Sequence, residues 1–227
     1  MNDALKNIIE RNSHRKLIAP APSKEEMDLV FKAALRAPDH AWLRPSYFIE
    51  VQGKGLDRLS KAFKDFATDH IKDLEPEKLD IYINAPYRAP MIIVLINTPK
   101  EHPKVPEIEQ IMSTATAGQN ILLALASLGY AGIWRTGTFA LNKKVNKYLD
   151  LNAEQQVLGY LYIGTPEGKQ KKIPELEPSD FVTKWEAQNE PKSFLYSIKR
   201  IRTILFYLFL VSFDHKLSVC RAWLCNW

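Results

Sequence analysis

The sequence predicts an α+β fold in which helices pack around a mixed sheet. Short apolar runs rich in β-branched residues indicate buried strands, and amphipathic segments of helical period lie between them. These helices and strands intermix without a regular β-α alternation, which favours a layered α+β arrangement over a doubly wound sheet. The chain has 227 residues, of which 46% are hydrophobic and 25% charged. This length and composition suit a globular domain with a sizeable core.

The N-terminal part predicts two helices followed by a strand. Residues 3–11 carry apolar side chains at helical spacing. Ser23 and Glu26 form a capping box, in which the two side chains satisfy free backbone amides at a helix start. That helix is expected to end before Pro38. Residues 47–52 then read as a short strand.

The remaining body predicts a long buried helix between buried strands. Residues 107–128 form the longest helical segment, nearly apolar all round in its second half, and Gly129 fits its C-terminal stop. The run 91–96 is a strand expected to be buried on both faces. The other expected elements are an amphipathic helix at 56–74, a strand at 131–136, a short helix capped by Asn142 at 142–149, and a buried strand at 157–163.

The net charge of +5 is concentrated in the last part of the chain. Residues 1–186 contain 25 Lys and Arg against 24 Asp and Glu, whereas residues 187–227 contain 6 against 2. The basic balance is therefore no argument that the body binds nucleic acid. Both cysteines, Cys220 and Cys225, also fall in the tail, so the body has no thiolate site or disulfide. We expect two parts, a folded domain at 1–186 and an atypical basic and aromatic tail at 187–227.

Three short clusters in the body combine cations with turn residues. Arginine beside a hydroxyl and free backbone amides suits a phosphate group, because the planar guanidinium offers paired donors. For any single cluster, a solvated or ion-paired surface arginine is the commoner explanation. No metal site and no catalytic triad is apparent. The clusters are Arg11-Asn12-Ser13 with Arg15, then Arg36-Ala37-Pro38-Asp39-His40, and Gly132-Ile133-Trp134-Arg135-Thr136-Gly137.

Taken together with three further segments, the clusters resemble the FMN-dependent nitroreductase family, and within it the small YdjA-like branch. The matching order runs from about residue 3 to about residue 185. The further segments are Asn84-Ala85-Pro86-Tyr87-Arg88-Ala89-Pro90, Lys104-Val105-Pro106, and Gly159-Tyr160-Leu161-Tyr162-Ile163-Gly164-Thr165-Pro166.

The resemblance implies a homodimeric α+β flavoenzyme with a largely antiparallel sheet and FMN at the subunit interface. No protein side chain is implied as catalytic, since the chemistry takes place at flavin N5. It also implies a nicotinamide-nucleotide contact at Ala124, Leu125, Ala126, Ser127, Leu128 and Gly129. The residues implied to bind FMN are Arg11, Asn12, Ser13, Arg15, Arg36, His40, Trp134, Arg135 and Thr136.

Several roles stay open from the residues alone. Arg11 and Arg135 are expected at the phosphate or ribityl end of FMN, with Arg15 or Arg36 nearer the ring. Trp134 either stacks near the flavin or fills the core. His40 is either a donor to the flavin or an ordinary loop histidine, because a general-base pair with its chain neighbour Asp39 is geometrically disfavoured.

The expected activity is hydride transfer from NADPH or NADH to flavin, then reduction of a nitroaromatic, quinone or similar small acceptor by a ping-pong mechanism. The alternative is a flavin- or nucleotide-binding sensor without turnover. Two departures from the family pattern bear on substrate choice. A second arginine of the opening motif is Asn12 here, and a Gln-Pro-Trp segment after the histidine is Arg44-Pro45-Ser46.

The N-terminus lacks the layout of a signal peptide, so a cytoplasmic location is expected. The apolar run inside the tail is too short to span a bilayer. Three explanations of the tail stay open: a peripheral membrane anchor, an element docking on the partner subunit, or a shifted reading frame.

Overall fold

The computed structural model describes residues 1–169 and 171–185. It divides into one unit from Met1 to Ile173 and a second from Pro174 onward. The described part of the second unit contains one short 3-10 helix, η5 (Pro178–Asp180). The expected tail at 187–227 lies outside the described residues, and the boundary at 186 stays a prediction.

A five-stranded sheet forms the centre of the first unit. The strand order is β1-β5-β3-β2, with β4 also paired to β5, and every ladder is antiparallel. The parallel contact among the described residues is an isolated bridge between Ser13 and Gly132. The α+β class and the predominance of antiparallel pairing are therefore confirmed, whereas the expectation of a mixed sheet is wrong for the ladders of the described residues. The strands are β1 (Leu17–Ile18), β2 (Ser46–Gln52), β3 (Met91–Asn97), β4 (Ala131–Arg135) and β5 (Gln156–Pro166).

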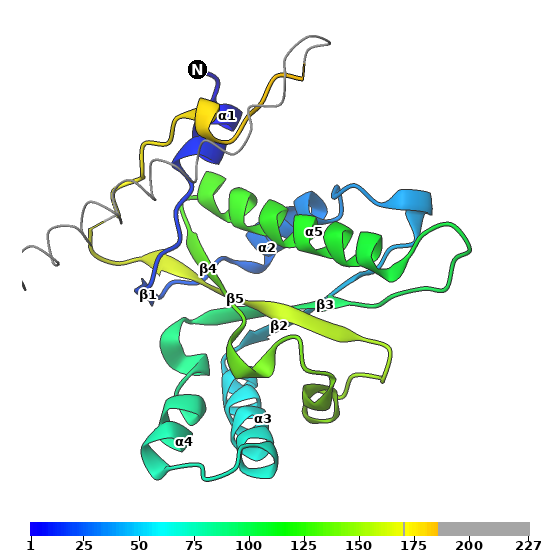
Figure 1. Ribbon diagram of the computed structural model, residues 1–227. Helices are drawn as coiled ribbons and strands as arrows, with labels where there is room; N and C mark the ends of the chain where they lie inside the picture. The colour runs from blue at the N-terminus through cyan, green and yellow to red at the C-terminus, as the bar shows by residue number, and fades with distance from the viewer. Residues whose placement is uncertain (170, 186–227) are drawn as a thin grey trace, which may run out of the picture. The chain divides into compact units, whose positions relative to one another are not determined.

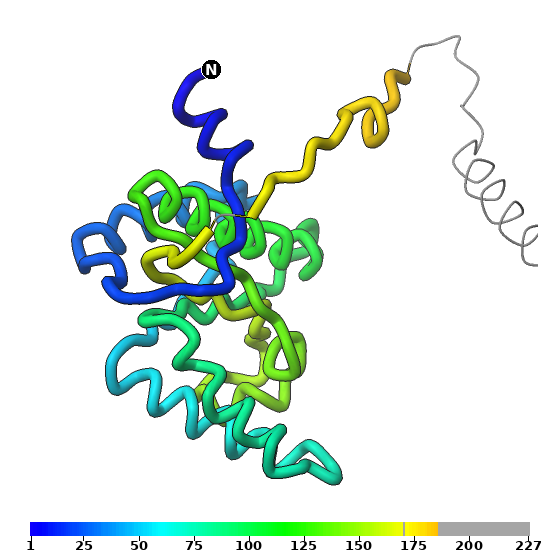
Figure 2. Tube along the Cα trace, turned by 90° about the vertical axis from the view of Figure 1, so that its left-hand side faces the viewer, coloured from blue at the N-terminus to red at the C-terminus, as the bar shows by residue number. Residues whose placement is uncertain are grey.

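Helices cover both faces of this sheet. α2 and α5 lie on one face and α3 and α4 on the other, while α1 lies at the end of the unit opposite α3 and α4 (Figures 1 and 2). The α-helices are α1 (Asp3–Glu10), α2 (Lys24–Ala34), α3 (Lys54–His70), α4 (Pro76–Ile83) and α5 (Glu107–Ser127). The 3-10 helices of this unit are η1 (His40–Trp42), η2 (Pro86–Arg88), η3 (Gly137–Phe139) and η4 (Lys143–Tyr148).

β3 is buried on both faces, as its composition predicts. Its alternate residues Ile92, Val94 and Ile96 join a cluster with Phe63 and Phe66 of α3. The intervening residues face the other way, because successive side chains of a strand point to opposite sides. Of these, Met91 and Ile93 belong to the second core cluster, whose buried members are Met27, Val30, Ala34, Met91, Ile93, Ala117, Ile121, Leu125, Leu161 and Ile163.

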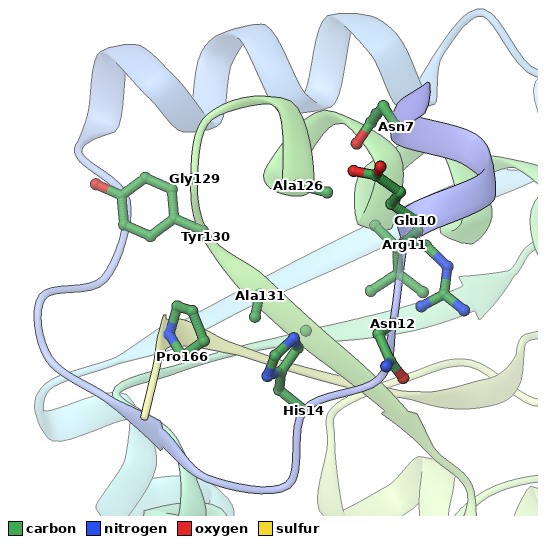
Figure 3. Close-up of a pocket in the computed structure, with 12 residues that line it drawn as sticks. Asn7, Glu10, Arg11, Asn12, His14, Ala126, Gly129, Tyr130, Ala131 and Pro166 are labelled. Atoms are coloured by element: carbon green, nitrogen blue, oxygen red, sulfur yellow. The ribbon is translucent and has the colours of Figure 1, made fainter. Parts of the chain in front are cut away.

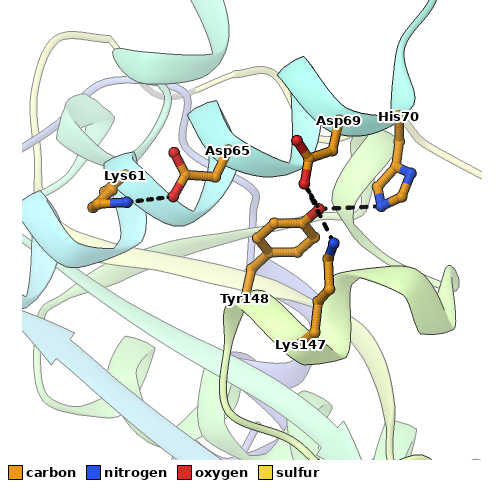
Figure 4. Close-up of polar contacts among 6 residues, drawn as sticks. All are labelled: Lys61, Asp65, Asp69, His70, Lys147 and Tyr148. Atoms are coloured by element: carbon orange, nitrogen blue, oxygen red, sulfur yellow. Dashed lines mark hydrogen bonds and ion pairs between the residues drawn. The ribbon is translucent and has the colours of Figure 1, made fainter.

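A polar cluster fastens η4 to the end of α3 (Figure 4). The Tyr148 hydroxyl donates to the Asp69 carboxylate and lies 3.2 Å from His70 Nε2, and Lys147 Nζ is 3.3 Å from Asp69. The hydrogen bonds from Tyr148 and Lys147 hold the pKa of Asp69 below its usual value. Because Tyr148 also packs edge-on against Phe66, the cluster continues the core outward.

Several element boundaries differ from those the sequence predicts. The helix expected at 56–74 ends at His70, since Ile71 takes an extended conformation with φ −103° and ψ 114°. The helix expected at 142–149 is the 3-10 helix η4, although Asn142 does cap it, accepting from the Lys144 amide at 3.1 Å. α4 and β1 were not predicted. No helix in the described ranges is long and apolar enough to cross a membrane.

Candidate functional site

A pocket lies where the end of α1 meets the end of α5 and the start of β4 (Figure 3). Its volume is about 210 Å³. Asn7, Glu10 and Arg11 line it from α1 and its cap, and Pro166 lines it from β5. The other lining residues are Asn12, His14, Leu122, Ala126, Gly129, Tyr130, Ala131 and Gly132. The pocket is therefore lined by residues of the first cluster (Arg11 and Asn12) and by the first residue of the third cluster (Gly132).

The pocket wall contains the carboxylate of Glu10 and the guanidinium of Arg11, and the guanidinium has unused hydrogen-bonding capacity. Arg11 Nη1 is buried and has no hydrogen-bond partner among the described residues. Beside it, burial lowers the pKa of His14, and the nearby charges of Lys171 and Arg11 lower it further. The imidazole is therefore biased toward its neutral form.

The short segment after Arg11 is held against β4. Ser13 bridges Gly132, and the His14 amide donates to the Gly132 carbonyl at 3.4 Å. Asn12 Nδ2 donates to the Lys171 carbonyl, and Asn12 Oδ1 accepts from the Ser13 amide, both at 2.9 Å. Asn12 thus orders this segment through its amide group. Arg15 is exposed.

The third cluster begins inside the core. The Trp134 indole donates through Nε1 to the Leu158 carbonyl at 3.2 Å. Its ring lies so close to Gly118 of α5 and Gly159 of β5 that a Cβ at either glycine would collide with it. This contact supports the core-filling alternative for Trp134.

Arg135, the last residue of β4, is the second partly buried arginine of the site. Its Nε is buried without a hydrogen-bond partner in the described part of the chain. The guanidinium carbon lies 5.4 Å from the centroid of the Tyr162 ring. Burial raises the pKa of Tyr162, and the charges of Arg88 and Arg135 oppose that rise. Thr136, which follows, is exposed.

The second cluster lies at the other end of α5. His40 Nδ1 is 2.7 Å from Glu109 Oε2, in the first turn of that helix, and both side chains are exposed. Asp39 does not face His40. Its carboxylate instead accepts from the Leu43 and Arg44 amides at 3.0 and 2.9 Å. Arg36 is exposed just beyond α2.

One subunit does not bring the first and second clusters together. Asn7 donates to the Leu123 carbonyl and to Ser127 Oγ, both at 2.9 Å, so the first cluster lies at the C-terminal end of α5. His40 contacts the N-terminal end of the same helix. At a rise of 1.5 Å per residue, Glu109 and Ser127 are about 27 Å apart along the helix axis.

The stretch expected to contact a nicotinamide nucleotide is divided between core and pocket. Ala126 and Gly129 line the pocket, whereas Leu125 is fully buried in the core. Gly129 has φ +83°, the left-handed conformation that ends a helix, so the stop predicted for α5 is confirmed.

Several pocket residues are not predicted by the sequence motifs, namely Asn7, Glu10, His14 and Tyr130. His14 lies inside the first cluster, so its position between Arg11 and Arg15 was the available signal. Tyr130 carries no local signal, because its hydroxyl donates to Glu26 Oε2 at 3.0 Å, a residue far away in the sequence.

The chain is similar in sequence and in fold to several known proteins. The protein called "Putative NAD(P)H nitroreductase YdjA" of Escherichia coli K12 is 35% identical over 182 residues, which are 80% of this chain and 98% of that protein. A nitroreductase-like protein from Bacillus cereus superposes with a TM-score of 0.72 at 20% identity, covering 82% of this chain and 98% of that one.

A third structure, a nitroreductase from Bacteroides fragilis with bound FMN, superposes with a TM-score of 0.64 at 21% identity. The superposition covers 82% of this chain and 100% of the Bacteroides fragilis chain. The model of the nitroreductase family matches residues 8–165. By fold, by sequence and by the match over most of its length, this chain belongs to the nitroreductase family.

Proposed function

We propose that this protein is an oxidoreductase of NAD(P)H and small acceptors such as nitroaromatics or quinones, with FMN as its cofactor. Family membership supports the proposal, together with the name of the Escherichia coli relative and the FMN bound to the Bacteroides fragilis structure. The chemistry that FMN supplies when bound is hydride exchange, first with NAD(P)H and then with the acceptor in the same place, which is a ping-pong sequence.

One observation carries the fit to FMN. Arg11 and Arg135 each have a buried guanidinium nitrogen without a hydrogen-bond partner in the described chain. A buried donor left unpaired is unfavourable, and a guanidinium pairs most strongly with an anionic oxygen. The three residue steps from Gly132 to Arg135 span about 10 Å along β4. Arg11 beside the pocket and Arg135 at the strand end can therefore serve separate parts of an elongated anionic cofactor.

The chain's own residues bind and orient the cofactor. Asn12 orders the segment that carries Arg11 and Ser13, and Trp134 fixes the end of β4 from which Arg135 extends. Arg15 and Thr136 are exposed and available to a ligand at the surface. Ala126 and Gly129 line the pocket, and this supports a nucleotide contact in part of the stretch 124–129.

The separation of the clusters points to a shared site. Arg36 and His40 lie near the opposite end of α5 from Arg11, so one subunit cannot supply both clusters to one flavin. A two-fold symmetric dimer can bring the first cluster of each subunit to the second cluster of the other, because in such an interface every contact occurs twice. We therefore include the homodimer in the proposal, with Arg36 and His40 of one subunit completing the site that contains Arg11 and Arg135 of its partner.

An absorption spectrum of the purified protein tests the cofactor. The proposal predicts flavin bands that bleach when NADPH or NADH is added without oxygen and recover when a nitroaromatic or quinone is added. A protein that neither carries nor takes up FMN would refute the proposal. A protein that binds FMN but is not reduced would be a sensor instead of an enzyme.

Mixing two inactive variants tests the shared site. Arg11→Ala and His40→Ala are each expected to lose most FMN binding. The two variants are then unfolded together and refolded, so that their subunits pair at random. Half of the dimers are mixed, and one of the two sites in each mixed dimer is intact, so about a quarter of all sites should bind FMN again.

The matched control is a mixture of Arg11→Ala with Arg135→Ala. Both residues are assigned to the same subunit's part of the site, so their mixed dimer holds no intact site and binding should not recover. Recovery in this control, or its absence in the Arg11 and His40 mixture, would contradict the shared site.

A further inference from the structure

The loop after His40 holds three non-glycine residues in the left-handed region. Ala41, Trp42 and Arg44 have φ values of 57°, 55° and 54°. This conformation is unfavourable for residues with a Cβ, and it persists only where the surroundings impose it. Such loops occur more often at binding and catalytic sites than elsewhere, so this one calls for an explanation.

Asp39 imposes the conformation from inside the loop. Its side chain is only 9% exposed, and its two oxygens accept from the backbone amides of Leu43 and Arg44. The second oxygen also pairs with Arg44 Nη1 at 3.2 Å. The backbone and one side of the Arg44 guanidinium are therefore held by a nearly buried carboxylate.

The result is an aromatic ring held outward beside a cation. Trp42 is 77% exposed, and the guanidinium carbon of Arg44 lies 5.5 Å from the centroid of its indole ring. An indole with so little contact contributes little to the core. The face of the Trp42 ring is therefore accessible to a ligand, and the positive charge of Arg44 lies beside it.

This pair coincides with the chain's departure from the family pattern. In the family pattern that the sequence resembles, this segment is Gln-Pro-Trp, whereas here it is Arg44-Pro45-Ser46, so the aromatic residue stands before the proline and the cation replaces an amide. Ser46 is the first residue of β2, and its hydroxyl donates to Thr114 Oγ1 at 3.3 Å. This hydrogen bond links β2 to α5, so Ser46 has a structural role.

We infer that Trp42 and Arg44 form the acceptor-selecting edge of the site and favour planar aromatic acceptors that carry an anionic substituent, such as nitrobenzoates. The inference rests on the proposed function, which places His40, two residues before Trp42, at the flavin. The indole supplies a stacking face, and the guanidinium pairs with the carboxylate of the acceptor.

Steady-state kinetics of the holoprotein with two acceptors test the inference. 4-Nitrobenzoate carries the anionic group and 4-nitrobenzyl alcohol lacks it. Trp42→Ala should lower kcat/KM for both acceptors by about 10-fold, within the range that aromatic pairing supports. Arg44→Gln should lower the ratio of nitrobenzoate to nitrobenzyl alcohol by about 10-fold, because only the anion loses its partner.

Two further variants complete the set. Trp42→Phe should restore most of the kcat/KM that Trp42→Ala loses, since a phenyl ring also stacks. The matched control is Ile81→Ala, another exposed apolar residue, on α4 on the opposite face of the sheet. Ile81→Ala should leave kcat/KM unchanged for both acceptors.

A binding measurement gives a readout that does not require turnover. 4-Nitrobenzoate should quench the tryptophan fluorescence of the wild-type holoprotein more strongly than that of Trp42→Phe. Equal quenching, or an unchanged acceptor ratio in Arg44→Gln, would overturn the inference while the proposed function stands. Loss of FMN or of the dimer in Trp42→Ala would also overturn it, by assigning Trp42 to the cofactor or the interface. A wild-type protein without flavin would overturn both.

Discussion

Replacing Gly159 with alanine should destabilise the fold through a single side chain, Trp134. A Cβ at Gly159 would collide with Nε1 of the Trp134 indole and lie 2.7 Å from its Cδ1. The ring has no room to retreat toward α5, because it already lies against Gly118, where a Cβ would be 2.8 Å from Cζ3. The indole must therefore tilt, and its hydrogen bond to the Leu158 carbonyl is lost.

The expected cost follows from two contributions. Forcing a methyl group into a packed core costs about 1–3 kcal/mol. A lost hydrogen bond of this kind costs about 1 kcal/mol. Together they give about 3 kcal/mol, which for a domain of this size corresponds to a decrease in Tm of roughly 6–12 °C. Because Arg135 follows Trp134, FMN affinity should fall as well.

Thermal unfolding followed by circular dichroism, with and without added FMN, measures both effects. The matched control is Gly55→Ala in the first turn of α3, where the added Cβ meets Val51 Cγ1 at 3.4 Å, an ordinary contact. Alanine favours helix over glycine, so this variant should be as stable as wild type or slightly more so. If Gly159→Ala unfolded at the wild-type temperature, the tight packing of Trp134 between the two glycines would be refuted.

Three further predictions concern a polar cluster, the pocket and a helix cap. The pKa of Asp69 is lowered in the folded state, so the stability it confers is present at neutral pH and disappears as the pH falls through that lowered value. Asp69→Asn should therefore destabilise the protein in urea unfolding at about pH 7, and the loss should shrink as the pH is lowered through the acidic range. Burial lowers the pKa of His14, so adding inorganic phosphate or FMN should raise it in an NMR titration, and an unchanged pKa would place the anion elsewhere. Ser23→Ala removes the acceptor of the Glu26 amide and should cost about 1 kcal/mol in urea unfolding; no loss would mean that water replaces the cap.

The sequence predicted the elements whose signals are local. The capping box of α2 and the stop of α5 at Gly129 both depend on side-chain chemistry within a few residues, and the structure contains both. The two-faced burial of β3 follows equally from its unbroken apolar run. By contrast, β1 has only two residues and exists through its pairing with Thr165 and Pro166 of β5.

The candidate site was predicted as a set of residues but not as an arrangement. Spacing along the chain cannot show that Arg11 and His40 lie at opposite ends of α5, since that depends on how the helix crosses the sheet. His14 and Tyr130 were missed for the same reason. The strained loop after His40 also has no sequence signature, because its left-handed residues are alanine, tryptophan and arginine in place of glycine.

The position of the two clusters at opposite ends of α5 has a thermodynamic consequence under the shared-site proposal. If each flavin needs both subunits, cofactor binding and subunit association become a single linked equilibrium. Dilution should then release FMN, and excess FMN should hold the dimer together at protein concentrations where the apoprotein dissociates. The apparent Kd for FMN would depend on protein concentration, so cofactor loss in a dilute cell extract would report weak association instead of a weak binding pocket.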